Sequence, residues 1–168
     1  ILITAHRREN LGEPMRHMFR AIKRIVEEHE DIKVIYPIHM NPVVRETANE
    51  ILGNDERIRI IEPLEVLDFH NLLNKSYLIL TDSGGIQEEA PSLGKPVIVL
   101  RDTTERPEGI AAGTLKLAGT DENVIYGLID ELLSDEAEYA RMSQASNPYG
   151  DGQASKRIVD AIIEKFRK

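Results

Sequence analysis

The chain contains no cysteine among its 168 residues. This absence excludes disulfides, thiolate metal ligands and a cysteine nucleophile, and it fits a reducing cytoplasm. The sequence also lacks any apolar run near the ~18 residues of a membrane span. Its 21 Lys and Arg are outnumbered by 29 Asp and Glu, so the net charge is −8 and a nucleic-acid partner is not expected. We therefore expect a cytoplasmic protein without a membrane or nucleic-acid partner.

Several motifs that would carry known chemistry are also missing. There is no G-x-x-x-x-G-K-[ST] phosphate loop, no G-x-G-x-x-G fingerprint and no G-x-S-x-G nucleophile elbow. The five histidines show no H-x-x-x-H or H-E-x-x-H spacing, so no metal site is expected. Glu88 and Glu89 are adjacent, so on a helix they point in different directions and do not form an acid–base pair. The sequence shows equipment for binding more clearly than for catalysis.

Segments with strand and helix character alternate regularly along the chain. A length of 168 residues, 41% of them apolar and 30% charged, is typical of one globular domain. The predicted strands are 1–4, 33–38, 57–61, 77–81, 96–100 and 115–118, and the predicted helices are 14–29, 42–52, 66–74, 86–93, 121–133, 137–143 and 153–166. Such alternation with continuous apolar strands indicates a parallel sheet with helices on both faces. The expected fold class is α/β, a doubly wound, Rossmann-like parallel sheet.

The most informative segment, 81–90, reads TDSGGIQEEA and joins a predicted strand to a predicted helix. Gly84 and Gly85 would let the backbone turn sharply and approach a ligand closely. The first turn of the helix would offer unpaired N–H groups, which suit a phosphate. Glu89, one turn beyond Gly85, would accept hydrogen bonds from the two hydroxyls of a ribose. The segment predicts a site for a nucleoside diphosphate, although a plain tight turn would also explain Ser-Gly-Gly.

Polar residues gather in the loops that follow the predicted strands. Ligands of doubly wound sheets bind beyond the carboxyl ends of the strands, so these loops should share one rim. The loops read AHRREN at 5–10, HMNP at 39–42, EPL at 62–64, DSGG at 82–85 and RDTTERPEG at 101–109. Their arginines suit bidentate phosphate contacts. Simpler explanations stay open: histidines hydrogen-bonded at strand ends, arginines in surface ion pairs, and acidic residues that favour a helix start.

These motifs resemble a known family. TAHRREN at 4–10, YPIHMNP at 36–42, DSGGIQEEAPSLGKPV at 82–97, RDTTERPEG at 101–109 and NPYGDGQASKRIV at 147–159 resemble, in family order, the non-hydrolysing UDP-N-acetylglucosamine 2-epimerases of bacteria. The resemblance implies a GT-B fold, in which two Rossmann-like domains flank a cleft. Residues 1–168 would be the C-terminal, UDP-binding domain, and the N-terminal domain with the catalytic carboxylates would lie outside them. The start at Ile1, inside a predicted strand and without an initiator methionine, also predicts a piece of a longer protein.

The resemblance further implies an isomerase that interconverts UDP-N-acetylglucosamine and UDP-N-acetylmannosamine. The reaction would proceed by elimination and re-addition of UDP, without NAD or metal, and would serve cell-surface polysaccharide synthesis. By the same resemblance, Ser83, Gly84 and Gly85 would hold the UDP diphosphate. Glu89 would bind the ribose hydroxyls, and Phe69 would form part of the uracil pocket.

The resemblance assigns the remaining site residues to the loops after the first, second and fifth strands. His6 would be the catalytic residue of this domain, since it would stabilise the leaving UDP. Arg106 would contact phosphate or sugar. Arg7 and His39 would contact a second UDP-N-acetylglucosamine that acts as an allosteric activator.

The implied partners are UDP, UDP-N-acetylglucosamine, the N-terminal domain of the same enzyme and a second copy in a homodimer. We expect the isolated chain to bind UDP but not to epimerise. Two alternatives stay open: the donor-nucleotide domain of a GT-B glycosyltransferase, and a stand-alone nucleotide-sugar sensor. The strings HRREN and RDTTERPEG argue against the glycosyltransferase. The apolar face of helix 153–166 is expected to be partly exposed when no partner covers it.

Overall fold

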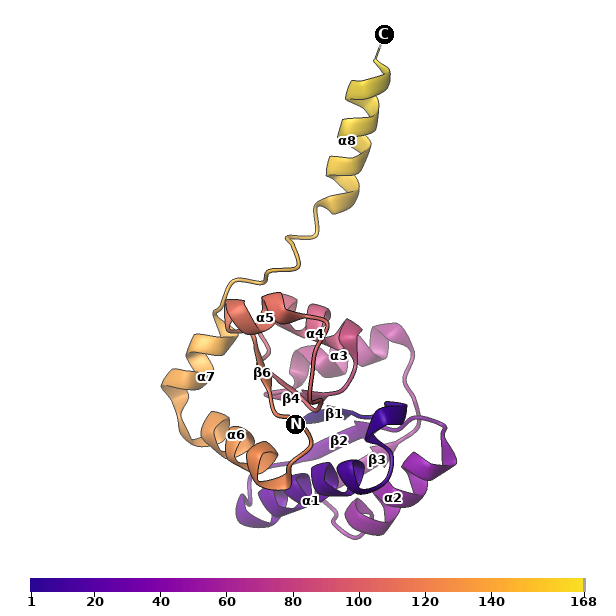
Figure 1. The fold of residues 1–168 in the computed structure, drawn as a ribbon, viewed down its shortest axis with the longest axis vertical. Coiled ribbons are helices and arrows are strands. Elements are labelled where there is room, and N and C mark those ends of the chain that lie inside the picture. The colour runs from indigo at the N-terminus through magenta and orange to yellow at the C-terminus, as the bar shows by residue number, and fades with distance from the viewer. Residues whose placement is uncertain (168) are drawn as a thin grey trace.

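The computed structural model describes residues 1–167. They contain a six-stranded sheet with helices packed around it (Figure 1). The strands are β1 (Leu2–Thr4), β2 (Val34–Pro37), β3 (Ile58–Ile61), β4 (Ile79–Thr81), β5 (Val97–Val99) and β6 (Leu115–Leu117). Their order is β3-β2-β1-β4-β5-β6, and every neighbouring pair is parallel. The winding reverses between β1 and β4, which makes their boundary the switch point of a doubly wound sheet. The predicted fold class is confirmed.

Helices connect the strands and follow the last one. Between the strands lie α1 (Glu13–Glu28), α2 (Pro42–Leu52), α3 (Val66–Lys75), α4 (Gly84–Glu89) and α5 (Pro107–Ala112). After β6 come α6 (Glu122–Ser134), α7 (Glu136–Ser143) and α8 (Ala154–Phe166). Local signals set several starts. For example, Asn41 caps α2 by accepting a hydrogen bond from the Val43 N–H at 3.0 Å, and Pro42 fits the first helical position.

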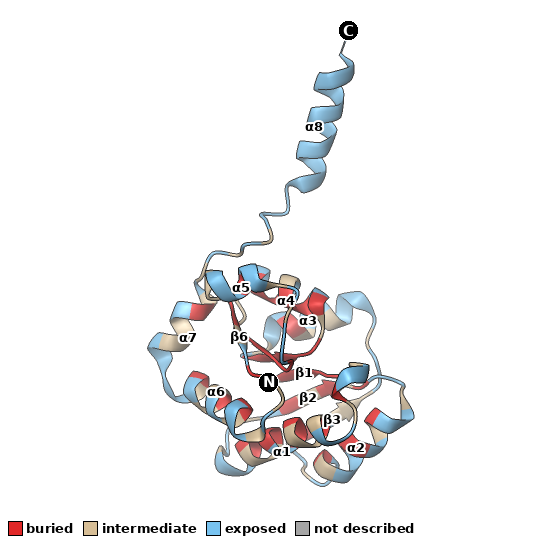
Figure 2. Ribbon diagram, in the orientation of Figure 1, coloured by how far each residue is buried: buried red, intermediate tan, exposed pale blue. Residues whose placement is uncertain are grey.

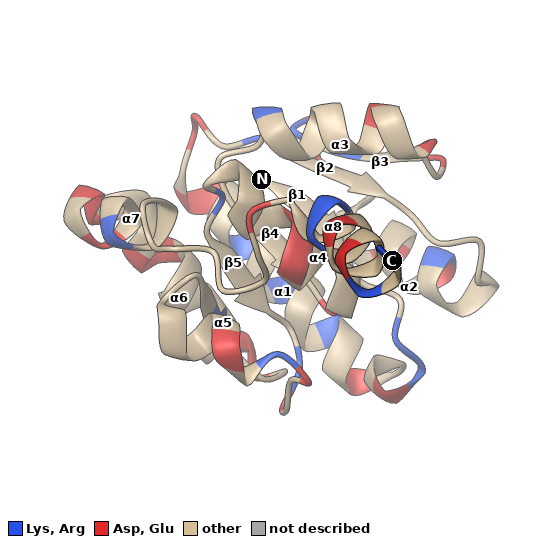
Figure 3. Cartoon of the chain, turned by 90° about the horizontal axis from the view of Figure 1, so that it is seen from above, with Lys and Arg blue, Asp and Glu red and all other residues tan. Residues whose placement is uncertain are grey.

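Two apolar clusters hold the helices on opposite faces of the sheet. One joins α1, α2 and α6 to Ile3 and Leu80, and the other joins α3 and α4 to Leu2 and Ile79. Successive residues of one strand thus face opposite clusters, as the period of a strand requires. β1, β4 and β5 carry no charged residue, and they are buried in Figure 2 and uncharged in Figure 3. Charged side chains therefore lie around this centre, on the helices, the loops and the outer strands β3 and β6, which carry Arg59 and Lys116.

Three local differences from the sequence-based prediction bear on the strand-end loops. α4 begins at Gly84 rather than at Ile86, and neither Gly84 nor Gly85 has a positive φ. The two glycines therefore form the first helical turn instead of a sharp turn before it. The loop after β5 contains α5, which begins at Pro107 and is not among the predicted helices. A 3-10 turn, η1 (Arg8–Asn10), shapes the loop after β1, and a second, η2 (Ala90–Leu93), continues α4.

The last helix projects away from the sheet (Figure 1). No residue of α8 is buried, and Figure 2 shows it exposed along its length. Its apolar side chains are each at least 50% exposed: Ile158, Val159, Ile162, Ile163 and Phe166. The predicted exposure of this face is confirmed. Among residues 1–167, no helix has the combination of length and apolar character that crossing a membrane requires.

Candidate functional site

The loops after β1 and β4 start side by side at the switch point of the sheet. Thr4 pairs with Thr81 in the parallel register, and their hydroxyl groups are hydrogen-bonded to each other. Both strands therefore end at the same level, and the chain opens there into 5–10 on one side and 82–85 on the other. A crevice at this position is where doubly wound sheets bind their ligands.

Asp82 ties the two loops together. Its side chain is fully buried, and Oδ2 accepts hydrogen bonds from the backbone N–H of His6 at 2.9 Å, that of Arg7 at 2.7 Å and Nδ2 of Asn10 at 3.1 Å. Asp82 therefore fixes the backbone of the loop after β1 against the end of β4. This contact sets the backbone positions from which the His6 and Arg7 side chains extend.

Two arginines from different loops converge on Gly84. A Cβ atom built on Gly84 would lie 3.8 Å from Nη2 of Arg106 and 3.9 Å from Nη2 of Arg7. Arg7 is oriented by a hydrogen bond from its Nε to the carbonyl of Asp82 at 3.1 Å. Both guanidinium groups therefore lie beside the first turn of α4, whose amides have no intrahelical partner. This arrangement of cationic forks and free N–H groups suits a phosphate.

Arg106 is itself held in place by residues of α4 and of its own loop. Its Nε is paired with Oε1 of Glu88, and its backbone N–H donates to Oγ1 of Thr104 at 3.0 Å. The Thr104 hydroxyl in turn donates to the buried Gln87, whose Nε2 donates to the carbonyl of Ser83 at 3.2 Å. The loop after β5 is therefore attached to the loop after β4 through side chains.

Arg101, by contrast, does not face the crevice. It is 9% exposed, its guanidinium makes a two-pronged contact with Glu105, and Glu9 lies 3.6 Å away. The Arg101 hydrogen bonds lower the pKa of Glu105 to about 2. For this pair the simpler explanation holds, since the two residues form an ion pair within their loop, although Arg101 is buried rather than on the surface.

The next turn of α4 places an acidic side chain beside the glycines. Oε1 of Glu89 would lie 3.6 Å from a Cβ atom on Gly85, so the two residues share one face of the helix as the sequence predicts. Oε2 of Glu89 lies 3.0 Å from Nε2 of His70, which comes from α3. The backbone N–H of Ser83 is occupied by Oγ1 of Thr81 at 2.9 Å. Phosphate contacts by Ser83 would therefore use its hydroxyl group.

A cavity of about 460 Å³ adjoins this turn at the ends of β1 to β4. His6 and His39 stack at its rim, with ring centroids 5.0 Å apart and an interplanar angle of 21°. The lining is mainly apolar and consists of Thr4, His6, Pro37, Ile38, His39, Met40, Pro63, Leu64, Phe69, Ser83 and Ile86. A mainly apolar cavity with a few polar groups fits a flat organic ring. His6, His39, Phe69 and Ser83 thus come together, and Ser83 adjoins the glycine turn.

Metal ligation is not apparent around these loops. Among residues 1–167, no group of three or more His, Asp or Glu side chains is arranged to hold a metal ion.

Comparison with known proteins places the chain in a family. The family model described as UDP-N-acetylglucosamine 2-epimerase matches residues 1–163. The chain belongs to the UDP-N-acetylglucosamine 2-epimerase family. The Bacillus subtilis (strain 168) protein named UDP-N-acetylglucosamine 2-epimerase is 69% identical to it over 163 residues, which cover 97% of this chain and 43% of the relative. The chain therefore spans less than half the length of this curated relative.

Two solved structures share the fold of the chain. An S. aureus MnaA structure with UDP has a TM-score of 0.95 at 58% identity and covers 99% of this chain and 46% of that one. The Neisseria meningitidis UDP-GlcNAc 2-epimerase bound to UDP-GlcNAc has a TM-score of 0.92 at 47% identity, over 97% of this chain and 44% of that one. The chain thus has the α/β fold of one part of these GT-B-like structures.

In this epimerase-family chain, no sequence motif singles out the residues that support the site. Asp82 was noted only as part of a motif, and Gln87 and Thr104 received no role. Their sequence signal is weak, because aspartates after strands and glutamines on helices are common in proteins with and without a binding site. A buried position for Asp82 could be read from its place between an apolar strand and Ser-Gly-Gly, but its hydrogen-bond partners lie more than 70 residues away.

Proposed function

We propose that this chain is the UDP-binding part of a UDP-N-acetylglucosamine 2-epimerase. The complete enzyme would interconvert UDP-N-acetylglucosamine and UDP-N-acetylmannosamine by eliminating UDP and adding it back after inversion at C2. Residues 1–168 would be its C-terminal domain and would hold the UDP throughout. The acid–base carboxylates would come from an N-terminal domain outside this chain, so the chain alone would not turn over substrate.

The observation that carries this proposal is the convergence of Arg7 and Arg106 on Gly84. Two guanidinium groups at the start of a helix offer the charge and the donor geometry that a diphosphate needs. Gly84 keeps the space between them free of a side chain. Hydrogen bonds from charged donors are worth roughly 1.5–3 kcal/mol each. Arg7, Arg106, the Ser83 hydroxyl and the amides of Gly84 and Gly85 would together hold the diphosphate and stabilise it as it leaves.

The other parts of the nucleotide have matching places on either side of the diphosphate. The apolar cavity beside Phe69 would take the uracil, and Glu89 would accept hydrogen bonds from the ribose. His6, at the rim of this cavity, would face the leaving phosphate. His39 stacks on His6 and Arg7 adjoins Gly84, so the proposed contacts of Arg7 and His39 with a second, activating UDP-N-acetylglucosamine would border the first site.

The proposed partners follow from the exposed last helix and from the length of the relatives. The apolar face of α8 would pack against the N-terminal domain, which would provide the burial that Ile158 and Phe166 lack here. The homodimer, the cytoplasmic location and the role in cell-surface polysaccharide synthesis rest on the family resemblance. The solved relatives with bound UDP and UDP-GlcNAc support the choice of ligand.

Thermal unfolding of the chain with and without UDP tests the proposal. A ligand at about 100 times its dissociation constant should stabilise the fold by about 2.7 kcal/mol. For a chain of this size that corresponds to a rise in Tm of roughly 5–11 °C. The rise should shrink in Glu89→Ala, because that variant loses the ribose contact. His17→Ala, which changes a half-buried residue of α1, is the matched control and should keep the full rise. An unchanged Tm at saturating UDP would refute the proposal.

A further inference from the structure

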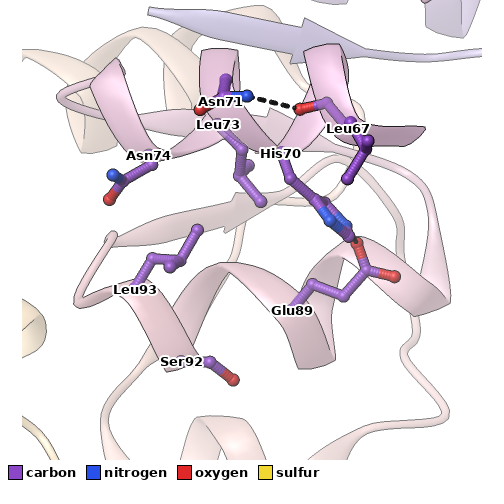
Figure 4. A pocket seen from close by; sticks show the side chains of 8 residues that line it. All are labelled: Leu67, His70, Asn71, Leu73, Asn74, Glu89, Ser92 and Leu93. Carbon is purple, nitrogen blue, oxygen red and sulfur yellow. Dashed lines mark hydrogen bonds and ion pairs between the residues drawn. The ribbon is translucent and has the colours of Figure 1, made fainter. Parts of the chain in front are cut away.

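The proposed ribose-binding carboxylate has a partner that the nucleotide assignment does not use. His70 projects from α3 toward α4, and its Nε2 lies 3.0 Å from Oε2 of Glu89 (Figure 4). A carboxylate oxygen accepts hydrogen bonds, so Nε2 is the donor in this contact. Both side chains are 45% exposed, so the contact lies at the edge of the site and is open to solvent on one side.

The two carboxylate oxygens of Glu89 have different neighbours. Oε2 is held by His70, and Oε1 faces Gly85 at the start of α4. A carboxylate can accept about four hydrogen bonds, two at each oxygen. Glu89 therefore keeps the capacity to accept from two ribose hydroxyls while His70 is bound. A half-exposed glutamate without such a partner would sample several rotamers, and a ligand would have to immobilise it on binding.

The space beside the pair makes this orientation necessary. A cavity of about 460 Å³ runs between α3 and the end of α4, away from the glycine turn. Figure 4 shows Leu67, Leu73 and Leu93 on its walls, with His70 and Glu89 together at one end. Without the His70 contact, the Glu89 side chain would have room to turn into this cavity and away from Gly85. His70 closes that alternative.

We propose that His70 is a positioning residue that holds the Glu89 carboxylate toward the glycine turn, and so sets the preference of the site for a ribose over a 2′-deoxyribose. The inference rests on the proposed function, because it assumes that Glu89 faces the ribose. It concerns a residue of α3 that touches no substrate group itself and acts through Glu89.

The test compares the binding of UDP and 2′-deoxy-UDP to the chain by isothermal titration calorimetry. We expect His70→Ala to weaken UDP binding roughly three- to tenfold, the cost of ordering one free side chain, while the affinity for 2′-deoxy-UDP changes little. His70→Gln should restore the preference for UDP, because its amide nitrogen donates from nearly the same place. His17→Ala is the matched control, because His17 also lies near a glutamate, with its Nε2 3.9 Å from Oε2 of Glu13, and it should bind as the parent does. Added to Glu89→Ala, His70→Ala should have no further effect.

Each contrary result overturns a different part. An unchanged ratio of the two affinities in His70→Ala would remove the positioning role. An equal loss of both nucleotides would show that His70 supports the fold of the site in general and does not orient Glu89. A Glu89→Ala variant that binds both nucleotides as tightly as the parent would overturn the ribose assignment itself. A parent chain that binds neither nucleotide would overturn the proposed function, and the inference with it.

Discussion

At the scale of single residues, one buried carboxylate links the polar residues of the two central loops. The Oδ2 atom of Asp82 accepts three hydrogen bonds, and two of the donors are the backbone amides of His6 and Arg7. In the described part of the chain, Oδ1 is buried without a hydrogen-bond partner. Burial raises the pKa of the Tyr36 hydroxyl, and the nearby Asp82 carboxylate raises it further. Asp82 thus acts on the site through the backbone and leaves the direct contacts to its neighbours.

The Arg101–Glu105 pair predicts how acid affects stability. Hydrogen bonds from Arg101 lower the pKa of Glu105 from 4.5 to about 2 in the folded chain. A carboxylate with a depressed folded pKa stabilises the fold above its unfolded value, and this contribution is lost as the pH falls from about 4.5 toward 2. Urea unfolding between pH 6 and pH 3 should therefore show a smaller loss of stability in Glu105→Gln than in the parent. Glu27→Gln, an exposed carboxylate on α1, is the control and should follow the parent curve. Identical curves for Glu105→Gln and the parent would contradict the prediction.

At the scale of elements, the start of α4 is the part on which phosphate binding depends. Gly84 lies in a helical conformation, and a Cβ atom there would make only ordinary contacts, at 3.8 and 3.9 Å, with the two guanidinium groups. That Cβ atom would nevertheless occupy the space between Arg7 and Arg106. A helical backbone at position 84 therefore favours alanine over glycine, whereas access of a phosphate to the two arginines favours glycine.

Gly84→Ala separates these demands. We expect the variant to fold, with stability equal to that of the parent or up to about 1 kcal/mol higher, because alanine favours a helix over glycine. Its affinity for UDP should fall at least about tenfold, since at least one phosphate contact is lost. Gly127→Ala in α6 is the matched control, because its Cβ atom would meet nothing within 4 Å. It should gain similar stability and bind UDP normally. Retained UDP affinity in Gly84→Ala would place the phosphate elsewhere.

The sequence predicted the elements well because their signals are local. Apolar strands and helical spacing indicated the sheet, and Pro42 and the apolar face of α1 fixed helices to within a residue or two. The failures lie where distant contacts decide. α5 is short and begins at Pro107 inside a charged loop, so its pattern is too brief to show a period. Gly84 and Gly85 indicated a sharp turn, but both lie in the first turn of α4 and neither has a positive φ.

The sequence predicts which residues lie at the candidate site, but it does not predict the side-chain contacts between them. The strand-end rule brings His6, His39 and Gly84 to one rim, and the structure places them there. The pairing of Glu89 with His70 joins α3 to α4, and no spacing in the sequence announces a contact across 19 residues. Such contacts depend on how the helices pack on the sheet, which the local pattern leaves open.

At the scale of the whole molecule, the chain divides into a packed α/β body and a projecting helix. All residues of α8 are exposed, whereas Tyr149, just before it, still contacts the body through its hydroxyl and the carbonyl of Arg106 at 3.4 Å. The stability of the body therefore should not depend on the residues after Gly150. The exposed apolar face of α8 favours self-association of the chain.

Deletion of residues 151–168 tests this division. We expect an unchanged Tm, because residues 151–167 are all exposed, and a lower tendency to self-associate, because the exposed apolar side chains of α8 are gone. Thermal unfolding and sedimentation velocity measure the two effects. Replacement of Ile158 and Ile162 by Ser in the intact chain is the control and should reproduce the change in association. A clear loss of stability on deletion would mean that α8 packs on the body in solution.

The central claim is that the arginines at Gly84 bind the diphosphate of a uridine nucleotide. The most direct measurement is the affinity of the chain for UDP and for uridine, by calorimetry, in the parent and in Arg7→Ala and Arg106→Ala, with Arg24→Ala on α1 as the control. We predict that the parent binds UDP at least about tenfold more tightly than uridine, and that either variant narrows this gap while Arg24→Ala keeps it. Equal affinities of the parent for UDP and uridine, or a gap that neither variant changes, would contradict the account.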